Sequence, residues 1–297
     1  MQTRAPQPLF VGPQTLDRVV ARRLGRATRL ALFLDYDGTL AHIARTPEDA
    51  VLAPLVRSVL RALVAQRGMR IAIVTGRSLR QIRPMVRSLQ VDLAVNHGLQ
   101  IVSDGRRWTH PALQAAVPHL KTIARDVADV LGPIPGVNIE NKRWSIGVHF
   151  RNVAARRIPT LRRLVRRMVR LYRGELTVLR GKMVLEIRPA APWTKGDAIL
   201  RLLSGPRYTG AFPVFIGDDR TDEDGFAVLA QRGLTIRVGR SRRTAAHYAV
   251  RTVQDVHAFL ELLRSGQRRT HRSSGRSVRG SGTEGGNRKT RREDQTP

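Results

Sequence analysis

Short apolar runs alternate with helical repeats along the first part of the chain. Residues 30–34 form an unbroken apolar run, which is typical of a strand buried on both faces of a parallel sheet. Residues 69–74 and 91–95 form two further apolar runs, and apolar positions recur at helical spacing over 52–64 and 79–89. The order strand, helix, strand, helix, strand predicts a doubly wound, Rossmann-like α/β core with a parallel sheet.

The pattern changes near residue 100. One hairpin with an Asp-Gly turn, two amphipathic helices and four short strands are predicted in this section. They cover 100–108 (hairpin), 111–131 and 158–173 (helices), and 137–140, 145–151, 176–180 and 183–188 (strands). This middle section indicates an inserted α/β domain with an antiparallel sheet.

The core pattern returns in the last third of the chain. A helix is predicted from residue 195, and buried strands are predicted over 211–216 and 233–238. A last helix is expected to end near residue 263.

These changes divide the chain into segments. Residues 28–101 and 190–264 make up the core, and the inserted domain takes up residues 102–189. Residues 1–27 form a leader with few periodic apolar positions. Residues 265–297 form a basic tail rich in Gly, Ser and Thr, which we expect to be disordered because it can bury little apolar surface.

The composition excludes several kinds of site. The chain has no cysteine, which rules out disulfides, thiolate nucleophiles and Cys-based zinc sites. No apolar stretch approaches the roughly 20 residues that cross a bilayer, and the first residues lack the apolar segment of a signal peptide. We therefore expect a soluble, cytoplasmic protein without a membrane partner, and a monomer.

The chain is strongly basic, with a formal net charge of +30. Such a charge attracts polyanions, so nucleic-acid binding is one interpretation, and an arginine-rich composition spread along the chain is the other. Arginines fill one face of the helix over 158–173, and the basic tail is a second place where polyanions would bind nonspecifically. No helix-turn-helix, zinc-knuckle or aromatic ribonucleoprotein signature accompanies the charge.

Polar side chains stand where the core strands end or where a core helix begins. They are Asp35, Asp37, Thr75, Lys195, Asp218, Asp219 and Asp222. Strand ends that are distant in sequence meet at one edge of a parallel sheet, so we expect these groups to converge. Closely spaced carboxylates suit a hard cation such as Mg²⁺, and one of them is a candidate nucleophile toward phosphorus. The set predicts magnesium-assisted phosphoryl transfer, with lysine and hydroxyl donors on the equatorial oxygens.

Two simpler interpretations of the first acidic turn are an ordinary strand-to-loop turn and a calcium loop. An EF-hand loop needs further oxygen ligands, a Glu at its twelfth position and flanking helices. Here a buried strand enters the turn and Thr39-Leu40-Ala41 follows, which disfavours calcium.

In these motifs the chain resembles the haloacid-dehalogenase-like phosphatases. Their DxDGT motif corresponds to Asp35-Tyr36-Asp37-Gly38-Thr39, and their three later motifs correspond to Thr75, Lys195 and Gly217-Asp218-Asp219, in the same order. The chain is most similar to the trehalose-6-phosphate phosphatases. The similar segments are ENKRWSIGVHFR at 140–151, GKMVLEIRP at 181–189, TKGDAI at 194–199 and GDDRTDEDGF at 217–226, and the resemblance covers residues 28–264.

The resemblance implies catalytic roles for four residues. Asp35 would be the nucleophile that forms an aspartyl-phosphate. Asp37 would protonate the departing sugar oxygen and then activate water, which lowers the cost of expelling an alkoxide. Thr75 and Lys195 would hold the phosphoryl oxygens.

The resemblance also implies a magnesium site. Mg²⁺ would be held by Asp35, by the backbone carbonyl of Asp37 and by Asp218. Asp219 and Asp222 would hold these ligands in position without binding the ion themselves.

The inserted domain would be the cap of such an enzyme, and it would recognise the sugar. Glu140, Lys142 and Glu186 would contact the glucose unit remote from the phosphate, whereas the alternative is that they are ordinary charges on a strand surface. Arg77 and His97 lie at core strand ends that face the site, where they would either touch substrate or shape the loop.

Three functions follow from these observations. The first is Mg²⁺-dependent hydrolysis of trehalose 6-phosphate to trehalose and phosphate, a step of trehalose biosynthesis. The second is hydrolysis of a related sucrose, glucosylglycerol or mannosylglycerate phosphate, which would differ in cap contacts. The third is a basic nucleic-acid-binding protein with a degenerate phosphatase core, which the presence of both Asp35 and Asp37 disfavours.

Overall fold

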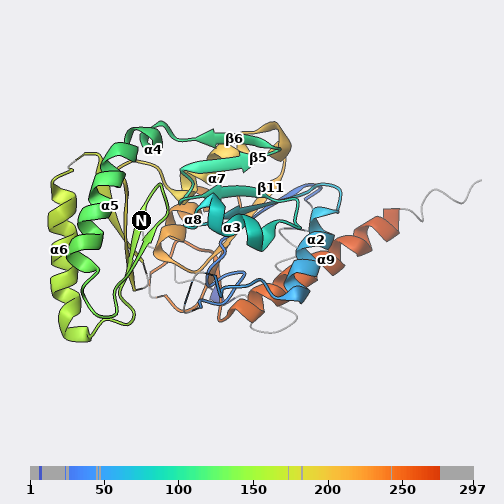
Figure 1. Cartoon of the computed structure of the whole chain (residues 1–297). Helices are drawn as coiled ribbons and strands as arrows, with labels where there is room; N and C mark the ends of the chain where they lie inside the picture. The colour runs from blue at the N-terminus through green and yellow to red at the C-terminus, as the bar shows by residue number, and fades with distance from the viewer. Residues whose placement is uncertain are drawn as a thin grey trace, which may run out of the picture.

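The computed structural model describes residues 7–8, 24, 27–44, 46, 48–172, 174–181, 183–241 and 243–274. These residues form two sheets with helices packed on them, which gives a larger core and a smaller inserted lobe (Figure 1). None of the helices in these ranges combines the length and the apolar character that a bilayer crossing requires.

The larger sheet has nine strands in the order β1-β13-β12-β11-β2-β3-β4-β5-β6. Neighbours from β1 to β4 pair in parallel, whereas β5 and β6 are antiparallel at one edge. The strands are Gln7–Pro8 (β1), Leu30–Leu34 (β2), Met69–Val74 (β3), Asp92–Val95 (β4), Gln100–Ser103 (β5), Arg106–Thr109 (β6), Phe212–Gly217 (β11), Leu234–Val238 (β12) and Tyr248–Val250 (β13). The core helices are α2 (Pro54–Val64), α3 (Leu79–Val86), α7 (Lys195–Leu203), α8 (Glu223–Leu229) and α9 (Val253–Ser274), with short 3₁₀ turns at η3 (Pro206–Tyr208) and η4 (Arg220–Asp222).

Strand β2 lies inside this sheet and is buried on both faces, as its unbroken apolar run predicts. Leu30, Leu32 and Leu34 pack with helices α2, α3 and α9 on one face. Ala31 and Phe33 pack with helices α7 and α8 on the other face. The doubly wound α/β core is therefore confirmed, since side chains from β2 enter both helix layers.

The inserted lobe has its own sheet and its own core. Its four antiparallel strands lie in the order β7-β8-β10-β9. They are Asn138–Asn141 (β7), Ile146–His149 (β8), Leu176–Gly181 (β9) and Val184–Pro189 (β10), and the helices of the lobe are α4 (Pro111–Ala115), α5 (Val117–Leu131), η2 (Ala155–Arg157) and α6 (Ile158–Arg170). Helices α5 and α6 cover one face of this sheet around Ile123, Val148 and Val165 (Figure 1). The other face is directed toward the core, as a cap requires.

The structure moves the start of the inserted lobe. The hairpin β5–β6 extends the larger sheet, because Leu93 of β4 pairs with Val102 and Ile101 pairs with Trp108. The insertion therefore begins after Thr109 and not at residue 102. An otherwise parallel sheet often carries antiparallel strands at its edge, and hydrophobic pattern alone does not say which sheet a hairpin joins.

Two predicted helices have different limits in the structure. The single helix expected over 111–131 is wrong, since α4 and α5 meet at Ala116. Pro118 has no N–H to donate to the carbonyl of Gln114, so a continuous helix is interrupted there. The helix expected over 158–173 ends at Arg170.

The two ends of the chain were expected to lie outside the fold. The last helix does not end near residue 263, because α9 continues to Ser274 and includes an ion pair between Arg264 and Glu261. The disorder expected from residue 265 is therefore wrong up to Ser274, and residues 275–297 lie outside the described residues. Within the leader, β1 pairs with β13 and Leu24 is buried, and its other residues up to 26 also lie outside the described ones.

Candidate active site

Three adjacent strands of the larger sheet end in polar groups. Asp35 follows β2, Thr75 follows β3 and Asp218 follows β11, and β2 lies between the other two strands. The chain winds from β2 toward β4 in one direction and from β11 toward β13 in the other, so these residues lie at a topological switch point. The predicted convergence of distant strand ends is confirmed.

Lys195 completes this group from the first turn of α7. Thr194 caps that helix in a capping box, in which its hydroxyl accepts from the backbone N–H of Asp197 and the Asp197 carboxylate accepts from the backbone N–H of Thr194. The cap fixes the helix start, so the side chain of Lys195 points into the site. Its Nζ donates to Asp35 Oδ1 and to Asp222 Oδ1, both at 2.7 Å.

Burial and charge act together on these groups. Burial raises the pKa of Asp35 well above its ordinary value, and Lys195 opposes the rise. Burial alone would lower the pKa of Lys195, but Asp222 and Asp35 outweigh it and raise that pKa, so the side chain is an ammonium ion at neutral pH.

The carboxylates in this group fit a small hard cation. One oxygen each from Asp35, Asp218 and Asp222 lies within 4.8 Å of the others, and all three residues are buried. Gly38, with φ of 81°, makes room for the Asp218 carboxylate, because a Cβ there would lie 2.3 Å from Asp218 Oδ2. Hard oxygen donors at this density are the ligands that Mg²⁺ prefers in proteins, and a divalent ion would offset the crowded negative charge.

Asp222 and Asp219 are tied to each other and to the lysine. Asp222 Oδ1 accepts from Lys195, and its Oδ2 accepts from the backbone N–H of Asp219 at 2.8 Å. A Cβ on Gly217 would lie 2.3 Å from the Asp222 carboxyl carbon, so that glycine lets the side chain approach the strand end. Both acids therefore brace the turn after β11, the place expected of supporting groups.

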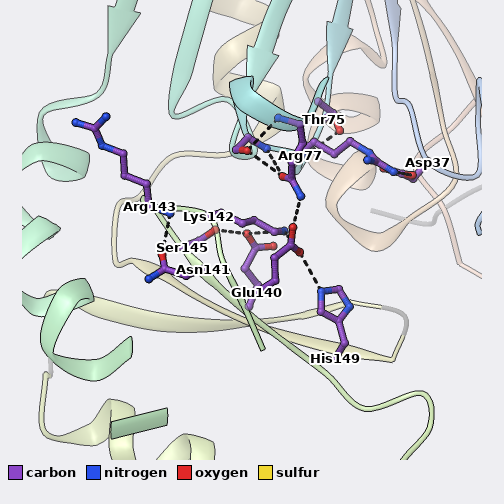
Figure 2. A network of polar contacts seen from close by, with 12 residues as sticks. Asp37, Thr75, Arg77, Glu140, Asn141, Lys142, Arg143, Ser145 and His149 are labelled. Atoms are coloured by element: carbon purple, nitrogen blue, oxygen red, sulfur yellow. Dashed lines mark hydrogen bonds and ion pairs between the residues drawn. The ribbon is translucent and has the colours of Figure 1, made fainter. Parts of the chain in front are cut away.

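Arg77 lies against Asp37 on the cap side of the site. Its Nε and Nη2 donate to the two Asp37 carboxylate oxygens, both at 2.6 Å (Figure 2). The guanidinium also lies over the Tyr36 ring, 5.2 Å from the centroid. The backbone N–H of Arg77 donates to Thr75 Oγ1 at 3.2 Å, which links this arginine to the end of β3.

A cavity of about 650 Å³ separates the core carboxylates from the cap sheet. On the cap side it is lined by Glu140, Lys142, His149, Arg151 and Glu186, all from β7, β8, β10 and their ends. Figure 2 shows Glu140, Lys142 and His149 directed toward the core strands that carry Asp37 and Thr75. The structure thus brings all three predicted cap residues to the same cavity as the strand-end acids.

His97 reaches across this cavity from a strained turn. Asn96, His97 and Gly98 have φ of 52°, 56° and 90°, and a Cβ on Gly76 would lie 2.6 Å from the His97 ring. His97 Nε2 lies 3.0 Å from Glu186 Oε2, so this histidine contacts a cap residue.

A family model described as Trehalose-phosphatase matches residues 33–255. The chain belongs to the trehalose-phosphatase family. Its fold is that of the haloacid-dehalogenase-like hydrolases, because a hydrolase of that description from Bacteroides thetaiotaomicron superposes with a TM-score of 0.56 at 16% identity, covering 80% of this chain and 100% of that one.

Individual relatives agree with this assignment. The chain is 36% identical over 245 residues to the Trehalose-phosphate phosphatase of Mycobacterium tuberculosis (strain ATCC 25618 / H37Rv), a match that covers 80% of this chain and 62% of the mycobacterial protein. It is 34% identical over 269 residues to Trehalose-phosphate phosphatase B of Arabidopsis thaliana, covering 86% and 71% of the two chains. The C-terminal domain of the C. albicans Trehalose-6-phosphate phosphatase shares the fold, with a TM-score of 0.74, 21% identity and coverage of 89% and 99%. The chain thus spans less than two thirds of the mycobacterial relative.

The sequence patterns did not identify two residues that contact Glu140 in this trehalose-phosphatase site. Gln81 of α3 donates from Nε2 to Glu140 Oε1, and His149 Nε2 lies 3.1 Å from Glu140 Oε2. Ser78-x-x-Gln81 is a capping-box pattern, which predicts where the helix starts but not a contact to the cap. His149 lies in the segment 140–151 that resembles the family, but no pattern in that segment predicts its contact with Glu140.

We expect Glu186→Gln to weaken the fold at pH 7 more than at pH 3. Burial alone would raise the pKa of Glu186, but Lys142 and His97 hold it well below the ordinary 4.5. The ionised carboxylate therefore stabilises the folded state above pH 4.5, and this contribution is lost as the pH falls toward the lowered pKa. In urea unfolding, the free energy of unfolding of the variant should be about 2 kcal/mol lower than that of the original chain at pH 7. This difference should be smaller at pH 3.

The matched control for that experiment is Glu48→Gln, which makes the same change at an exposed position. It should stay within about 0.5 kcal/mol of the original chain at both pH values. A Glu186→Gln deficit that is constant between pH 7 and pH 3 would contradict the assignment of Glu186 as a stabilised buried anion.

Proposed function

We propose that this chain hydrolyses trehalose 6-phosphate to trehalose and phosphate. The observation that carries the proposal is the contact of Lys195 Nζ with Asp35 and Asp222, which joins three separate motifs of the family into one buried site. Membership of the trehalose-phosphatase family supports the choice of substrate.

Asp35 is the proposed nucleophile. Its carboxylate oxygen attacks phosphorus, the bond between phosphorus and the sugar oxygen breaks, and an aspartyl-phosphate forms. Asp37 gives its proton to the departing sugar oxygen, then takes a proton from the water that attacks the aspartyl-phosphate and releases phosphate. The position of Asp37, two residues beyond Asp35 at the cavity wall, supports this division of work.

Thr75 and Lys195 are the proposed donors to the non-bridging phosphoryl oxygens. The Thr75 hydroxyl accepts a hydrogen bond from Arg77, which leaves its own proton for a phosphoryl oxygen. The ammonium of Lys195 is fixed before substrate arrives, so its charge needs no reorganisation during the reaction. A bound Mg²⁺, with Asp35, Asp218 and the backbone carbonyl of Asp37 as proposed ligands, would neutralise charge between the anionic nucleophile and the anionic phosphate.

The cap residues are the proposed sugar ligands. The carboxylates of Glu140 and Glu186 would accept hydrogen bonds from the hydroxyls of the glucose unit remote from the phosphate. The ammonium group of Lys142 would donate to those hydroxyls. Arg77 is proposed to orient Asp37 rather than to bind sugar, because both Asp37 oxygens accept from it. A cytoplasmic location, a monomeric state and nonspecific binding of polyanions by the basic tail stay predictions from the sequence.

A phosphate-release panel tests the proposed substrate. Trehalose 6-phosphate, sucrose 6-phosphate, a glucosylglycerol phosphate and a mannosylglycerate phosphate are compared in the presence of Mg²⁺, with a chelator control. We expect trehalose 6-phosphate to have the highest kcat/KM and the chelator to stop release. A higher kcat/KM for another sugar phosphate would contradict the proposed substrate and would identify that ester as the preferred one.

A further inference from the structure

The two cap carboxylates Glu140 and Glu186 each divide their oxygens between the two lobes. Within the cap, Glu140 Oε2 lies 3.1 Å from His149 Nε2 and 3.9 Å from Lys142 Nζ. Its other oxygen, Oε1, accepts from Gln81 Nε2 of core helix α3. One carboxylate oxygen is thus held inside the cap and the other is held by the core.

Glu186 repeats this arrangement on β10, which is separated from β7 by β8. Its Oε1 accepts from Ser145 Oγ at 2.6 Å and lies 3.5 Å from Lys142 Nζ, both inside the cap. Its Oε2 lies 3.0 Å from Nε2 of His97, which belongs to the core. Two independent contacts therefore cross the cavity, and both end on a carboxylate.

From this we propose that Gln81 and His97 are core positioning residues that hold Glu140 and Glu186 over the phosphate site and so select sugar esters. The proposal rests on the proposed function, in which these carboxylates receive the sugar. We refer to Gln81 and His97 as the latch. A phosphate ester without sugar hydroxyls has no need of the cap carboxylates, so the latch acts on sugar esters alone.

The hydrogen bonds of Gln81 fix which end of its amide faces the cap. Gln81 Oε1 accepts from the Ser78 N–H and the Ser78 hydroxyl, both at 2.9 Å. Its Nε2 is therefore the donor that is left for Glu140. Ser78 lies three residues after Thr75, so α3 connects the cap contact directly to the end of β3, where the phosphate is expected.

The orientation of His97 is also fixed by its surroundings. It adopts a left-handed backbone conformation, and its ring fills the space that Gly76 leaves open. An ionised carboxylate oxygen can only accept, so the contact at 3.0 Å requires Nε2 of His97 to carry a proton and donate it to Glu186. Both members of the latch therefore present a single hydrogen-bond donor to a cap anion.

The variant Gln81→Glu tests the latch with little disturbance to α3. Glu is the favoured third residue of a capping box, so the helix start is retained, whereas the donor to Glu140 is replaced by a carboxylate that repels it. We expect KM for trehalose 6-phosphate to rise about tenfold or more, as loss of a hydrogen bond to a charged group implies. We expect kcat/KM for p-nitrophenyl phosphate to fall by a much smaller factor, because that ester feels only the added negative charge and makes no sugar contact with the cap. Gln90→Glu, the same change at an exposed position beyond α3, should alter neither value.

A distance measurement between the cap and the core reports the position of the cap directly and does not depend on the substrate. The chain has no cysteine, so spin labels on Arg163→Cys in the cap and Arg87→Cys in the core are specific, and both positions are exposed. In the labelled full chain, Gln81→Glu and His97→Asn should each lengthen and broaden the distance distribution. Asn suits the second variant because it tolerates the left-handed backbone but is too short to reach Glu186.

The outcomes separate the latch from the proposed function. Unchanged distances in both variants overturn the latch, and so does an unchanged KM for trehalose 6-phosphate in Gln81→Glu. Equal losses on trehalose 6-phosphate and p-nitrophenyl phosphate also overturn it, because they indicate damage to the core. If the unaltered chain does not hydrolyse trehalose 6-phosphate, the proposed function fails, while the distances still decide whether the latch exists.

Discussion

Asp35→Asn is expected to lower kcat for trehalose 6-phosphate by at least about 10⁴-fold, as loss of a nucleophile does in other covalent mechanisms. An amide oxygen is a poor nucleophile and cannot form the aspartyl-phosphate. The fold should survive, because burial already raises the pKa of Asp35 and a neutral amide of the same shape removes that unfavourable charge. Phosphate release and thermal unfolding, measured on the same preparation, separate the two effects.

The control for this variant is Asp104→Asn in the exposed turn between β5 and β6. Asp104 has a φ of 52°, a conformation that Asn adopts readily, so the change is chemically identical and structurally mild. We expect turnover in this control to equal that of the original chain. Turnover of Asp35→Asn close to the original would contradict the covalent mechanism.

Lys195→Met is expected to damage both the fold and the reaction. Met keeps the length of the side chain but removes the ammonium ion that bridges Asp35 and Asp222, two buried carboxylates. Leaving such charges unpaired costs about 3–5 kcal/mol, which urea unfolding at pH 7 would measure. Losing one fixed positive donor at the reacting group should lower kcat by about 10²–10³-fold.

Two comparisons make the Lys195 result specific. Lys121→Met, on the exposed face of α5, should stay within about 0.5 kcal/mol of the original chain. Adding Asp222→Asn to Lys195→Met should recover stability without recovering turnover, since it removes a buried charge but supplies no donor. Lys195→Met with unchanged stability would contradict the ion pairs on which the site is built.

The sequence predicted the core of the site because the signal there is local. The apolar run before Asp35 marks a strand buried on both faces, and the next apolar run ends at Thr75. The rule that parallel strands end at one edge then places Asp35, Thr75 and Asp218 together. No contact between these residues had to be known in advance.

The remaining features depend on contacts that no local pattern encodes. The hairpin at β5 and β6 has the same pattern whether it extends the core sheet or starts the cap, and only its pairing with β4 decides. Gln81 meets Glu140 across 59 positions of sequence, so the capping box identified the helix start and not the cap contact. The end of α9 was also not predictable from a local pattern. The composition after residue 264 indicates disorder, although the helix continues to Ser274.

The measurement that tests the central claim most directly is capture of the phosphorylated residue. The chain is mixed with Mg²⁺ and trehalose 6-phosphate labelled at phosphorus, the reaction is stopped in acid, and the labelled peptide is identified. We predict the label on the peptide that contains Asp35, and none on that peptide without Mg²⁺. A label on a peptide that lacks Asp35, or steady phosphate release with none on the Asp35 peptide at any quench time, would contradict the account.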